Sequence, residues 1–481
     1  MFDGEPSIFT QLLYGLVEGK TFWKNGEQTL SEQDALNKIR EIEASLMARI
    51  PEHKLRPRLE PTKRAVGLLG DPQKAYRVIH VTGTNGKTST SRMIERILRE
   101  HGLRTGRFTS PHLIDLNERI ALDGEPISNE ILYEVFKDIE PVLDMVDQEL
   151  LAQGESRLTF FEALAALAFA AFADAPIDVL VLEVGMGGEW DSTNVADGDV
   201  AVFTPIDIDH TERLGETITD IATTKAGIIK ANAAVVSSVQ TKEALDVIQD
   251  RATTVADTLR VLGRDFAVTE FQEDAHGVTF SLKGLTNIYK DLFIPLHGAY
   301  QAANAAVAIA AVEEFLGSAT IAIPDHILRP ALADVSSPGR LQVISKSPRI
   351  ILDAAHNPHG ARSLADALEN SFGLPHTVAV ISILNDKDVL GVLNAGEPVV
   401  SEVIITQSTS VRAHTAETLA QTAREVFGEE RVSVEDDFRD ALSLAEAKLP
   451  PTPNATIVVT GSISLIGDVL KFRQIQEDAD V

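Results

Sequence analysis

The sequence predicts an α/β protein with a doubly wound, mostly parallel sheet, a small antiparallel appendage and a second, smaller α/β domain. From residue 77 onward, short β-rich runs alternate with helical runs, which is typical of a parallel sheet covered by helices on both faces. A second alternating series begins after residues 336–339. The length of 481 residues also allows more than one domain.

The elements of the first domain follow in order along the chain. An amphipathic helix is predicted at 27–50, with Ala35, Ile39, Ile42 and Leu46 at helical spacing. Strands are predicted at 77–82, 103–108, 178–183, 199–204 and 233–236. Helices are predicted at 87–101, 129–150, 159–173 and 217–229. Residues 257–295 contain short strands without a helix, which predicts the antiparallel appendage, and a helix at 299–315 returns the chain to the first domain.

A boundary near residues 336–339 divides the chain into two predicted domains, 1–337 and 338–481. Strands of the second domain are predicted at 341–344, 349–353, 376–382, 401–406 and 455–460. Its helices are predicted at 359–370, 414–426 and 437–447. We expect the first domain to be of the P-loop type and the second to be Rossmann-like.

The composition excludes several classes of function. With 71 acidic and 43 basic residues the formal net charge is −28, which disfavours binding to nucleic acid and to anionic membranes. The absence of cysteine excludes disulfides, thiolate catalysis and zinc sites with cysteine ligands. The most apolar stretch, 160–173, is too short to span a membrane and contains Glu162. We expect a soluble, monomeric, cytoplasmic protein without a secretory leader.

The stretch TGTNGKT at 82–88 follows an apolar run and precedes a helix-compatible run. Backbone N–H groups at such a helix N-terminus bind anions well, and Gly83 and Gly86 allow a tight turn and close approach of a phosphate. Lys87 supplies charge, and Thr88 a hydroxyl that can ligate Mg²⁺. The strict pattern GxxxxGK[ST] fails because Val81 stands where its first glycine belongs. The alternative is a capping turn with an exposed lysine.

Four further polar residues lie at or just after the ends of predicted strands, or in a predicted helix. Glu183 ends an apolar strand, where a magnesium ligand or an ordinary acid before a turn could stand. Ser110 begins a loop with Pro111 and His112, and such loops often carry functional residues. The alternative is a surface loop that proline stiffens. His210 follows a strand, and packing is the commoner role for such a histidine. Lys225 lies among apolar residues and therefore needs a partner or a modified state.

In the second domain, Asp353 and His356 lie between an apolar strand and a helix. The alternative for Asp353 is a helix cap. The residues Thr88, Ser110, Glu183 and His210 all lie just past strand ends, so in a doubly wound sheet they converge on one edge. Their common position predicts a single site.

The order of these motifs resembles the Mur ligase-like ATP-dependent ligases, and within them the folylpolyglutamate and dihydrofolate synthases. The resemblance covers most of the chain, and the loop TGTNGKT is the form typical of that family. It is carried by HVTGTNGKTST at 80–90, TSPHL at 109–113, ERI at 118–120, LEVGMGGEWDSTN at 182–194, DHTERLG at 209–215, KAGII at 225–229, QAANAAVA at 301–308, SPGRLQ at 337–342 and DAAHNPHGA at 353–361.

The resemblance implies that ATP binds with its phosphates on the loop at 83–88, formed by Gly83, Thr84, Asn85, Gly86, Lys87 and Thr88. It implies that Asn304 contacts adenine and that Arg340 and Asp353 contact the nucleotide from the second domain. His356 would lie near the γ-phosphate.

For metals, the resemblance implies one Mg²⁺ on Thr88, Ser110 and Glu183. A second would lie between Glu183, His210 and a carbamylated Lys225, and a monovalent cation is a further candidate cofactor. A carbamate would also explain a lysine in apolar surroundings, because it turns a cation into an oxygen ligand.

The reaction implied is ligation of L-glutamate to dihydropteroate or a folate through an acyl phosphate, with Ser110, Pro111 and His112 in the folate-binding loop.

One departure is Glu189, where relatives usually carry arginine. A peptidoglycan Mur ligase is the alternative within the fold; it usually has an arginine motif where this chain reads DAAHNPHG, and a longer N-terminal part. A non-catalytic nucleotide-binding regulator is the alternative from another class.

Overall fold

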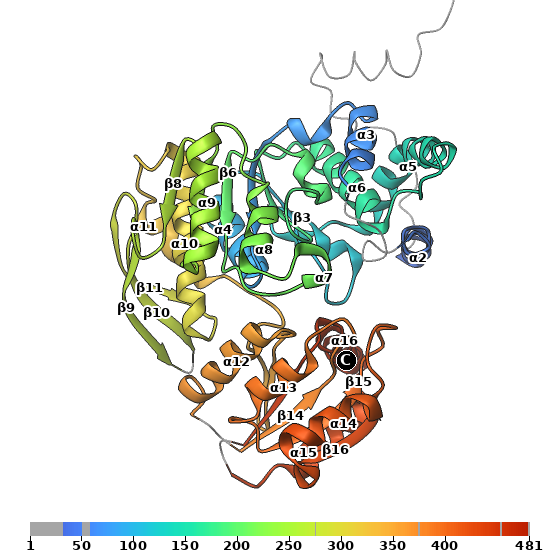
Figure 1. Ribbon diagram of the computed structural model, residues 1–481, viewed down its shortest axis with the longest axis vertical. Coiled ribbons are helices and arrows are strands. Elements are labelled where there is room, and N and C mark those ends of the chain that lie inside the picture. The colour runs from blue at the N-terminus through green and yellow to red at the C-terminus, as the bar shows by residue number, and fades with distance from the viewer. Residues whose placement is uncertain (1–31, 51–57, 275, 374–375, 453–454, 480–481) are drawn as a thin grey trace, which may run out of the picture.

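The computed structural model describes residues 32–50, 58–274, 276–373, 376–452 and 455–479, and Figure 1 shows two α/β parts stacked one above the other. The upper part is built on an eight-stranded sheet of order β4-β3-β2-β5-β1-β6-β7-β8. Six of these strands are parallel, and β3 and β4 extend the sheet antiparallel at one edge. The strands are β1 Arg77–Thr82, β2 Thr105–Phe108, β3 Ile120–Leu122, β4 Glu125–Pro126, β5 Val179–Glu183, β6 Val200–Phe203, β7 Ala234–Ser237 and β8 Thr258–Val261.

Helices cover both faces of this sheet because its central strands are apolar on both sides. On one face Ile79 and Val81 of β1 share a buried core with α4, α10 and α11. On the other face Val78 packs with α2, α3, α5 and α6, and α8 and α9 cover β6 and β7. These helices are α2 Glu32–Met47, α3 Glu60–Leu68, α4 Lys87–Glu100, α5 Asn129–Ala152, α6 Phe160–Asp174, α7 Thr211–Leu214, α8 Ile218–Ala226, α9 Lys242–Val255, α10 Ala299–Gly317 and α11 Asp325–Ala333, with short 3-10 turns at Pro72–Lys74, Leu116–Arg119 and Ser192–Val195.

The antiparallel appendage is a separate three-stranded sheet of β9 Ala267–Asp274, β10 Gly277–Lys283 and β11 Ile288–Ile294. The prediction that it begins at residue 257 was wrong, because β8 Thr258–Val261 pairs parallel with β7 and belongs to the large sheet. The apolar positions of such a short strand do not reveal which sheet it joins. The predicted return helix is confirmed as α10, which packs against α4.

The lower part contains a six-stranded sheet of order β12-β13-β17-β14-β15-β16. Its elements are β12 Gln342–Lys346, β13 Arg349–Leu352, β14 Thr377–Ile381, β15 Glu402–Gln407, β16 Val432–Asp437, β17 Thr456–Thr460, α12 Pro358–Asn370, α13 Val389–Gly396, α14 Ala416–Phe427, a 3-10 turn at Glu429–Arg431, α15 Phe438–Lys448 and α16 Ile463–Ala479. Only β12 runs antiparallel to its neighbour. The predicted mixed fold of two α/β parts is therefore confirmed.

Several elements were not predicted from the sequence: α3, α7, α9, α11, α13, α16, β3, β4 and β16. The core face of α9 consists of Ala244, Ile248 and Ala252, so alanines weaken its apolar pattern. Of the helix predicted at 27–50, α2 covers Glu32–Met47 with Ile39, Ile42 and Leu46 buried. Residues 27–31 and the Ala35 side chain lie outside the described part.

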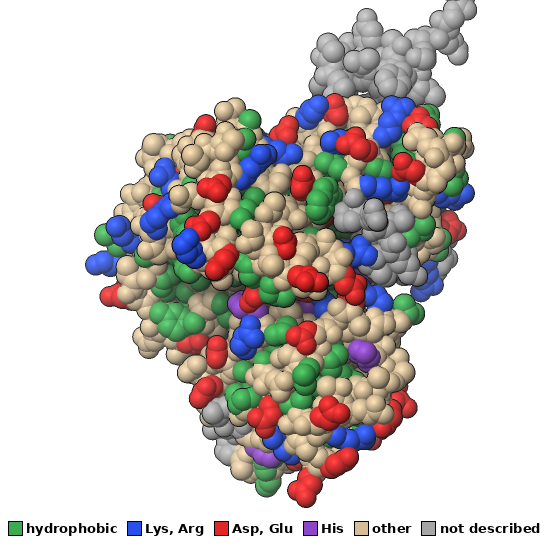
Figure 2. All heavy atoms as spheres, in the orientation of Figure 1, with side chains coloured by type: hydrophobic (Ala, Val, Ile, Leu, Met, Phe, Trp, Pro, Cys, Tyr) green, Lys and Arg blue, Asp and Glu red, His purple; other side chains and the backbone are tan. Residues whose placement is uncertain are grey.

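None of the described helices is both long and apolar enough to cross a membrane. On the face that Figure 2 shows, acidic side chains are interspersed with basic ones over both parts rather than gathered in one patch. This distribution agrees with a surface charge that is spread over the molecule.

The two parts pack closely where the loop after β2 meets α16. Leu113 of that loop packs against the apolar core of the lower part. Gly467 of α16 lies directly against the Leu113 carbonyl, so that a Cβ at residue 467 would collide with this oxygen. A glycine is therefore required for the two parts to approach this closely.

We expect Gly467→Ala to lower the free energy of unfolding by about 1–3 kcal/mol, because overpacking forces the backbone apart. The measurement is chemical unfolding of the full chain. Gly396→Ala in α13 is the matched control, since its nearest neighbouring atom would be 3.9 Å from the new Cβ. Equal stability of the two variants would contradict this account of the contact.

Candidate active site

The stretch 83–86 forms a tight loop between β1 and α4, as predicted. Gly86 has φ +87° and caps α4, and a Cβ there would lie 2.8 Å from Asn304 Oδ1. A Cβ at Gly83 would collide with the Thr204 hydroxyl. Both glycines therefore keep the loop narrow and its backbone accessible to a phosphate.

Lys87 is the first residue of α4 and folds back over the loop. Its Nζ donates to the carbonyl oxygens of Gly83 at 3.1 Å and Thr84 at 3.3 Å. Burial lowers the pKa of Lys87, while the nearby carboxylates of Glu183 and Asp209 act in the opposite direction. The lysine is thus held in the position from which it can reach bound phosphates.

Glu183 ends β5 beside this loop, and its carboxylate accepts a hydrogen bond from Thr88. The Thr88 Oγ1 lies 3.0 Å from Oε1 and 3.1 Å from Oε2 of Glu183. Burial raises the pKa of Glu183, and Lys87 and Thr88 lower it. A buried carboxylate beside a hydroxyl at a phosphate loop is a suitable donor set for Mg²⁺, which prefers oxygen ligands and usually keeps phosphate oxygens among them.

Ser110 follows β2, and among the described residues no hydrogen bond occupies its hydroxyl. Its neighbours Thr109 and Pro111 line one pocket together with Thr88. Across the described part of the chain, no three Asp, Glu or His side chains gather into a metal site. A magnesium ion here would therefore be held by the single carboxylate of Glu183, by the hydroxyls of Thr88 and Ser110 and by the nucleotide's phosphates.

Lys225, at the end of α8, is buried and donates from Nζ to Gly83 O at 2.8 Å. It thus contacts the same loop carbonyl as Lys87. Burial and the charge of Lys87 lower the pKa of Lys225 to about 7. Lys225 therefore lies against the phosphate loop, and its amine is largely neutral above that pH.

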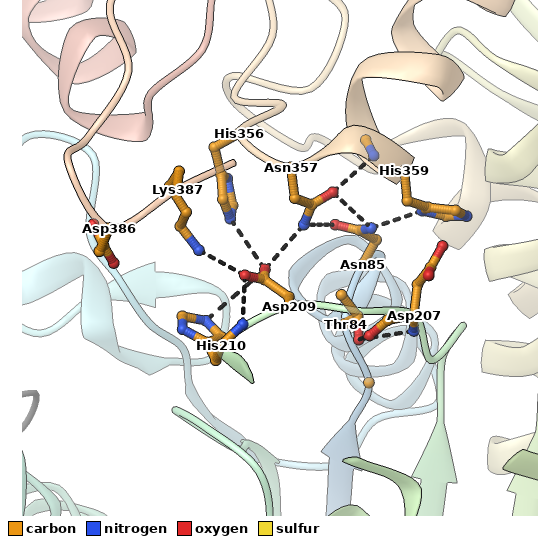
Figure 3. Close-up of polar contacts among 12 residues, drawn as sticks. Thr84, Asn85, Asp207, Asp209, His210, His356, Asn357, His359, Asp386 and Lys387 are labelled. Atoms are coloured by element: carbon orange, nitrogen blue, oxygen red, sulfur yellow. Dashed lines mark hydrogen bonds and ion pairs between the residues drawn. The ribbon is translucent and has the colours of Figure 1, made fainter. Parts of the chain in front are cut away.

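Asp209 lies at the seam between the two parts of the molecule, as Figure 3 shows. Its carboxylate accepts from Lys387 Nζ at 2.9 Å and from Asn357 Nδ2 at 3.0 Å, both in the lower part. His356 Nε2 and His210 Nε2 each lie 3.9 Å away. Burial raises the pKa of Asp209, but the surrounding histidines and Lys387 outweigh it and hold the pKa below its usual range.

Asn85 of the phosphate loop contacts the second part of the molecule at this seam (Figure 3). Its side-chain amide pairs with that of Asn357 at 3.3 Å in both directions, and its Nδ2 lies 2.7 Å from His359 Nδ1. Asn357 is the N-cap of α12 and is thereby fixed. The loop and the start of α12 are consequently positioned by each other.

The histidines at the seam are neutral at pH 7. Burial and, to a smaller extent, the charge of Lys387 lower the pKa of His210 to about 3 and that of His356 to about 4. His356 Nδ1 also contacts the Ala354 carbonyl at 2.9 Å. Neutral imidazoles can ligate a metal or accept a proton, which cationic ones cannot.

The predicted nucleotide contacts of the second domain lie nearby but have local partners. The buried Asp353 accepts from the backbone N–H groups of Leu341 and Ala355, both at 2.9 Å, which is a structural role. Arg340 lines the pocket with Thr88 and donates to Gly339 O at 3.2 Å. In the first domain, Asn304 pairs with Gln301 at 3.1 Å beside Gly86.

His112, in the predicted folate loop, is the acceptor for Arg119 Nε at 2.9 Å. Burial and the charge of Arg119 lower the pKa of His112 to about 3. The exposed Glu189 donates from its backbone N–H to Thr224 O at 2.9 Å, so the departure from arginine leaves this backbone contact in place.

Sequence reasoning missed Asp209 and Lys387. Asp209 stands beside the singled-out His210, but nothing local shows that an aspartate will pair with a lysine 178 residues later. Lys387 follows a predicted strand, at the sheet edge where functional side chains gather. This position after a strand is the sequence signal by which Lys387 could have been recognised as a site residue.

Comparison with known proteins gives matches over most of the chain. Residues 81–312 match the Mur ligase middle domain, and residues 339–463 match the Mur ligase glutamate ligase domain. A Mycobacterium tuberculosis protein named dihydrofolate synthase/folylpolyglutamate synthase is 40% identical over 455 residues, covering 90% of this chain and 93% of that protein. The chain belongs to this family.

Other relatives agree. A Bacillus subtilis dihydrofolate synthase/folylpolyglutamate synthase is 36% identical over 421 residues, covering 87% of this chain and 95% of its own. The structure of the Mycobacterium tuberculosis folylpolyglutamate synthase complexed with ADP superposes with a TM-score of 0.87 at 40% identity, over 91% of this chain and 99% of that one. The fold of a folylpolyglutamate synthase is therefore shared by the two proteins.

We expect a double-mutant cycle of Asp209→Asn and Lys387→Met to give a coupling free energy of about 1–3 kcal/mol in unfolding, because both side chains are at most 10% exposed. The ion pair of Arg412 with Asp386 is the control, since its side chains are 36% and 33% exposed. For that pair we expect less than about 1 kcal/mol. A weaker coupling for Asp209 than for Asp386 would contradict a structural role of the seam pair.

Proposed function

We propose that this protein is an ATP-dependent ligase that joins L-glutamate to the carboxylate of dihydropteroate or of a folate, releasing ADP and phosphate. The observation that carries the proposal is the phosphate loop with Lys87, which meets the second domain at Asp209 and Asn357. The relatives named as dihydrofolate and folylpolyglutamate synthases support it. They disfavour the peptidoglycan Mur ligase alternative, and the E. coli FolC structure in complex with DHPP and ADP supports the substrate class.

The chemistry divides into two transfers. An oxygen of the acceptor carboxylate attacks the γ-phosphorus of ATP, and ADP leaves. The amine of glutamate then attacks the carbonyl carbon of the acyl phosphate, loses a proton, and phosphate leaves from the tetrahedral intermediate. Lys87 offsets the charge on the phosphoryl oxygens. Closure of the two domains around the bound substrates would exclude water, which would otherwise hydrolyse the acyl phosphate.

We assign the remaining roles as follows. Thr88, Ser110 and Glu183 would hold one Mg²⁺. Glu183, His210 and a carbamylated Lys225 would hold a second. Bound magnesium would withdraw negative charge from the transferring phosphoryl group.

The nucleotide would be held by the phosphate-loop residues, by Asn304, and by Arg340 and Asp353. His356 would lie near the γ-phosphate. The loop at Ser110, Pro111 and His112 would contact the folate, and a monovalent cation is a further candidate. We further propose a division at residues 337/338, a monomer and a cytoplasmic location, with no nucleic-acid or membrane partner.

The test is ADP formation by the purified protein with dihydropteroate and, separately, tetrahydrofolate, each with and without L-glutamate. We expect ADP release only when ATP, an acceptor and glutamate are all present. In Lys87→Ala, which removes the hydrogen bonds to the Gly83 and Thr84 carbonyls, we expect turnover to fall by at least about 100-fold with the fold retained by circular dichroism. Near-normal turnover in this variant, or ADP release that is independent of glutamate, would refute the proposal.

The carbamate on Lys225 makes a separate prediction. Carbon dioxide reacts with a neutral amine, and the pKa of Lys225 near 7 makes the amine increasingly neutral as pH rises through that value. We therefore expect carbamate, observed by NMR with isotopically labelled bicarbonate, to increase between about pH 6 and pH 8.

Lys225→Arg is the control, because arginine forms no such adduct. We expect Lys225→Ala to lose turnover and to recover part of it with short carboxylic acids. A wild-type enzyme without adduct at pH 8, together with full activity of Lys225→Ala, would rule out this role.

A further inference from the structure

Arg92 lies one turn after Thr88 on α4, which places both residues on the same helix face. Both line a small, partly open pocket between the phosphate-loop helix, the loop after β2 and the second domain. The other residues that line it are Thr109, Pro111, Leu113, Glu118, Ser337, Pro338, Arg340 and Ile463. The pocket thus joins the predicted phosphate end of the site to the predicted folate loop.

The Arg92 guanidinium is half-buried, and within the described part of the chain no hydrogen bond or ion pair reaches it. Three carboxylates act on its charge, those of Glu95, Glu118 and Glu183. Each of them has other partners. Glu95 pairs with Arg107 at 2.7 Å, and Glu183 accepts from Thr88.

Glu118 is occupied by backbone. Its carboxylate accepts from the N–H groups of Leu113 and Ile114 at 2.8 Å each and of Asp115 at 2.9 Å. These bonds hold the loop after β2 in its turn. Glu118 is therefore used to shape the folate loop.

Burial and the charge of Arg107 lower the pKa of Arg92 to about 10, so that the guanidinium stays protonated at pH 7. A half-buried cation without a hydrogen-bond acceptor is costly, and a ligand anion would remove that cost. The planar fork of arginine donors matches the two oxygens of a carboxylate.

We propose that Arg92 binds the carboxylate of the pteroate or folate acceptor, the same carboxylate that receives the phosphoryl group. This inference rests on the proposed function. Two features favour a carboxylate over a nucleotide phosphate. Arg92 shares its pocket with Pro111 of the folate loop, and the phosphate loop already has Lys87 for the nucleotide. Thr88, one turn before Arg92, brings the γ-phosphate side of the site next to this carboxylate.

The experiment compares two ligands and two proteins. Equilibrium binding of dihydropteroate and of its carboxamide is measured by calorimetry in the presence of a non-hydrolysable ATP analogue. For the wild-type protein we expect the carboxylate to bind roughly 10–100-fold more tightly than the carboxamide, as for a charge-assisted hydrogen bond. In Arg92→Gln we expect this ratio to fall close to one, with affinity for the ATP analogue unchanged within about twofold.

Arg96→Gln is the matched control, because Arg96 lies one turn further along α4 and pairs with Glu100 and Asp334. We expect it to keep the wild-type ratio. If Arg92→Gln does not fold, Arg92→Lys replaces it. For this variant we expect an intermediate ratio of carboxylate to carboxamide affinity, because lysine keeps the charge but lacks the planar pair of donors.

An unchanged ratio in the Arg92 variant would overturn the proposal. So would a loss of affinity confined to the ATP analogue, which would assign Arg92 to the nucleotide. A wild-type protein that binds and ligates no pteroate or folate would instead contradict the proposed function.

Discussion

The site lies where the two parts of the molecule meet, and the carboxylate of Asp209, whose side chain is 10% exposed, links them there. It accepts hydrogen bonds from Lys387 and Asn357 of the second domain. Asn357 in turn pairs with Asn85 of the phosphate loop. The phosphate loop, Asp209 and the start of α12 are thus joined by hydrogen bonds. A change in the position of the second domain therefore moves the phosphate loop directly.

Basic side chains gather at the seam between the two parts, although the protein as a whole is acidic. The chain carries a formal net charge of −28, yet it concentrates cationic side chains around the loop and pocket. These are Lys87, Arg92, Arg340 and Lys387. A local positive site within an acidic protein is what an anionic substrate requires, because it offsets the repulsion of the surrounding field. The neutral histidines add polarity without adding to this charge.

Much of the architecture could be predicted because its signals are local. The run ending at Glu183, the glycines of the loop and the position of Lys225 each follow from a few neighbouring residues. The expected convergence of Thr88, Ser110, Glu183 and His210 follows from the rule that parallel strands end at one edge. The pairing of Asp209 with Lys387 could not be predicted, since it depends on how two domains dock. For the same reason the sequence did not predict that β8 belongs to the large sheet, because its pairing with β7 depends on the tertiary structure.

The most direct test of the central claim, that ATP activates a carboxylate, follows an oxygen atom. The acceptor is supplied with isotopically labelled oxygen in its carboxylate and ligated to glutamate in ordinary water, and the released phosphate is analysed by mass spectrometry. The account predicts one labelled oxygen in each phosphate, since the carboxylate oxygen that attacked the γ-phosphorus leaves with it. Phosphate without label, formed while the ligated product accumulates, would contradict the account.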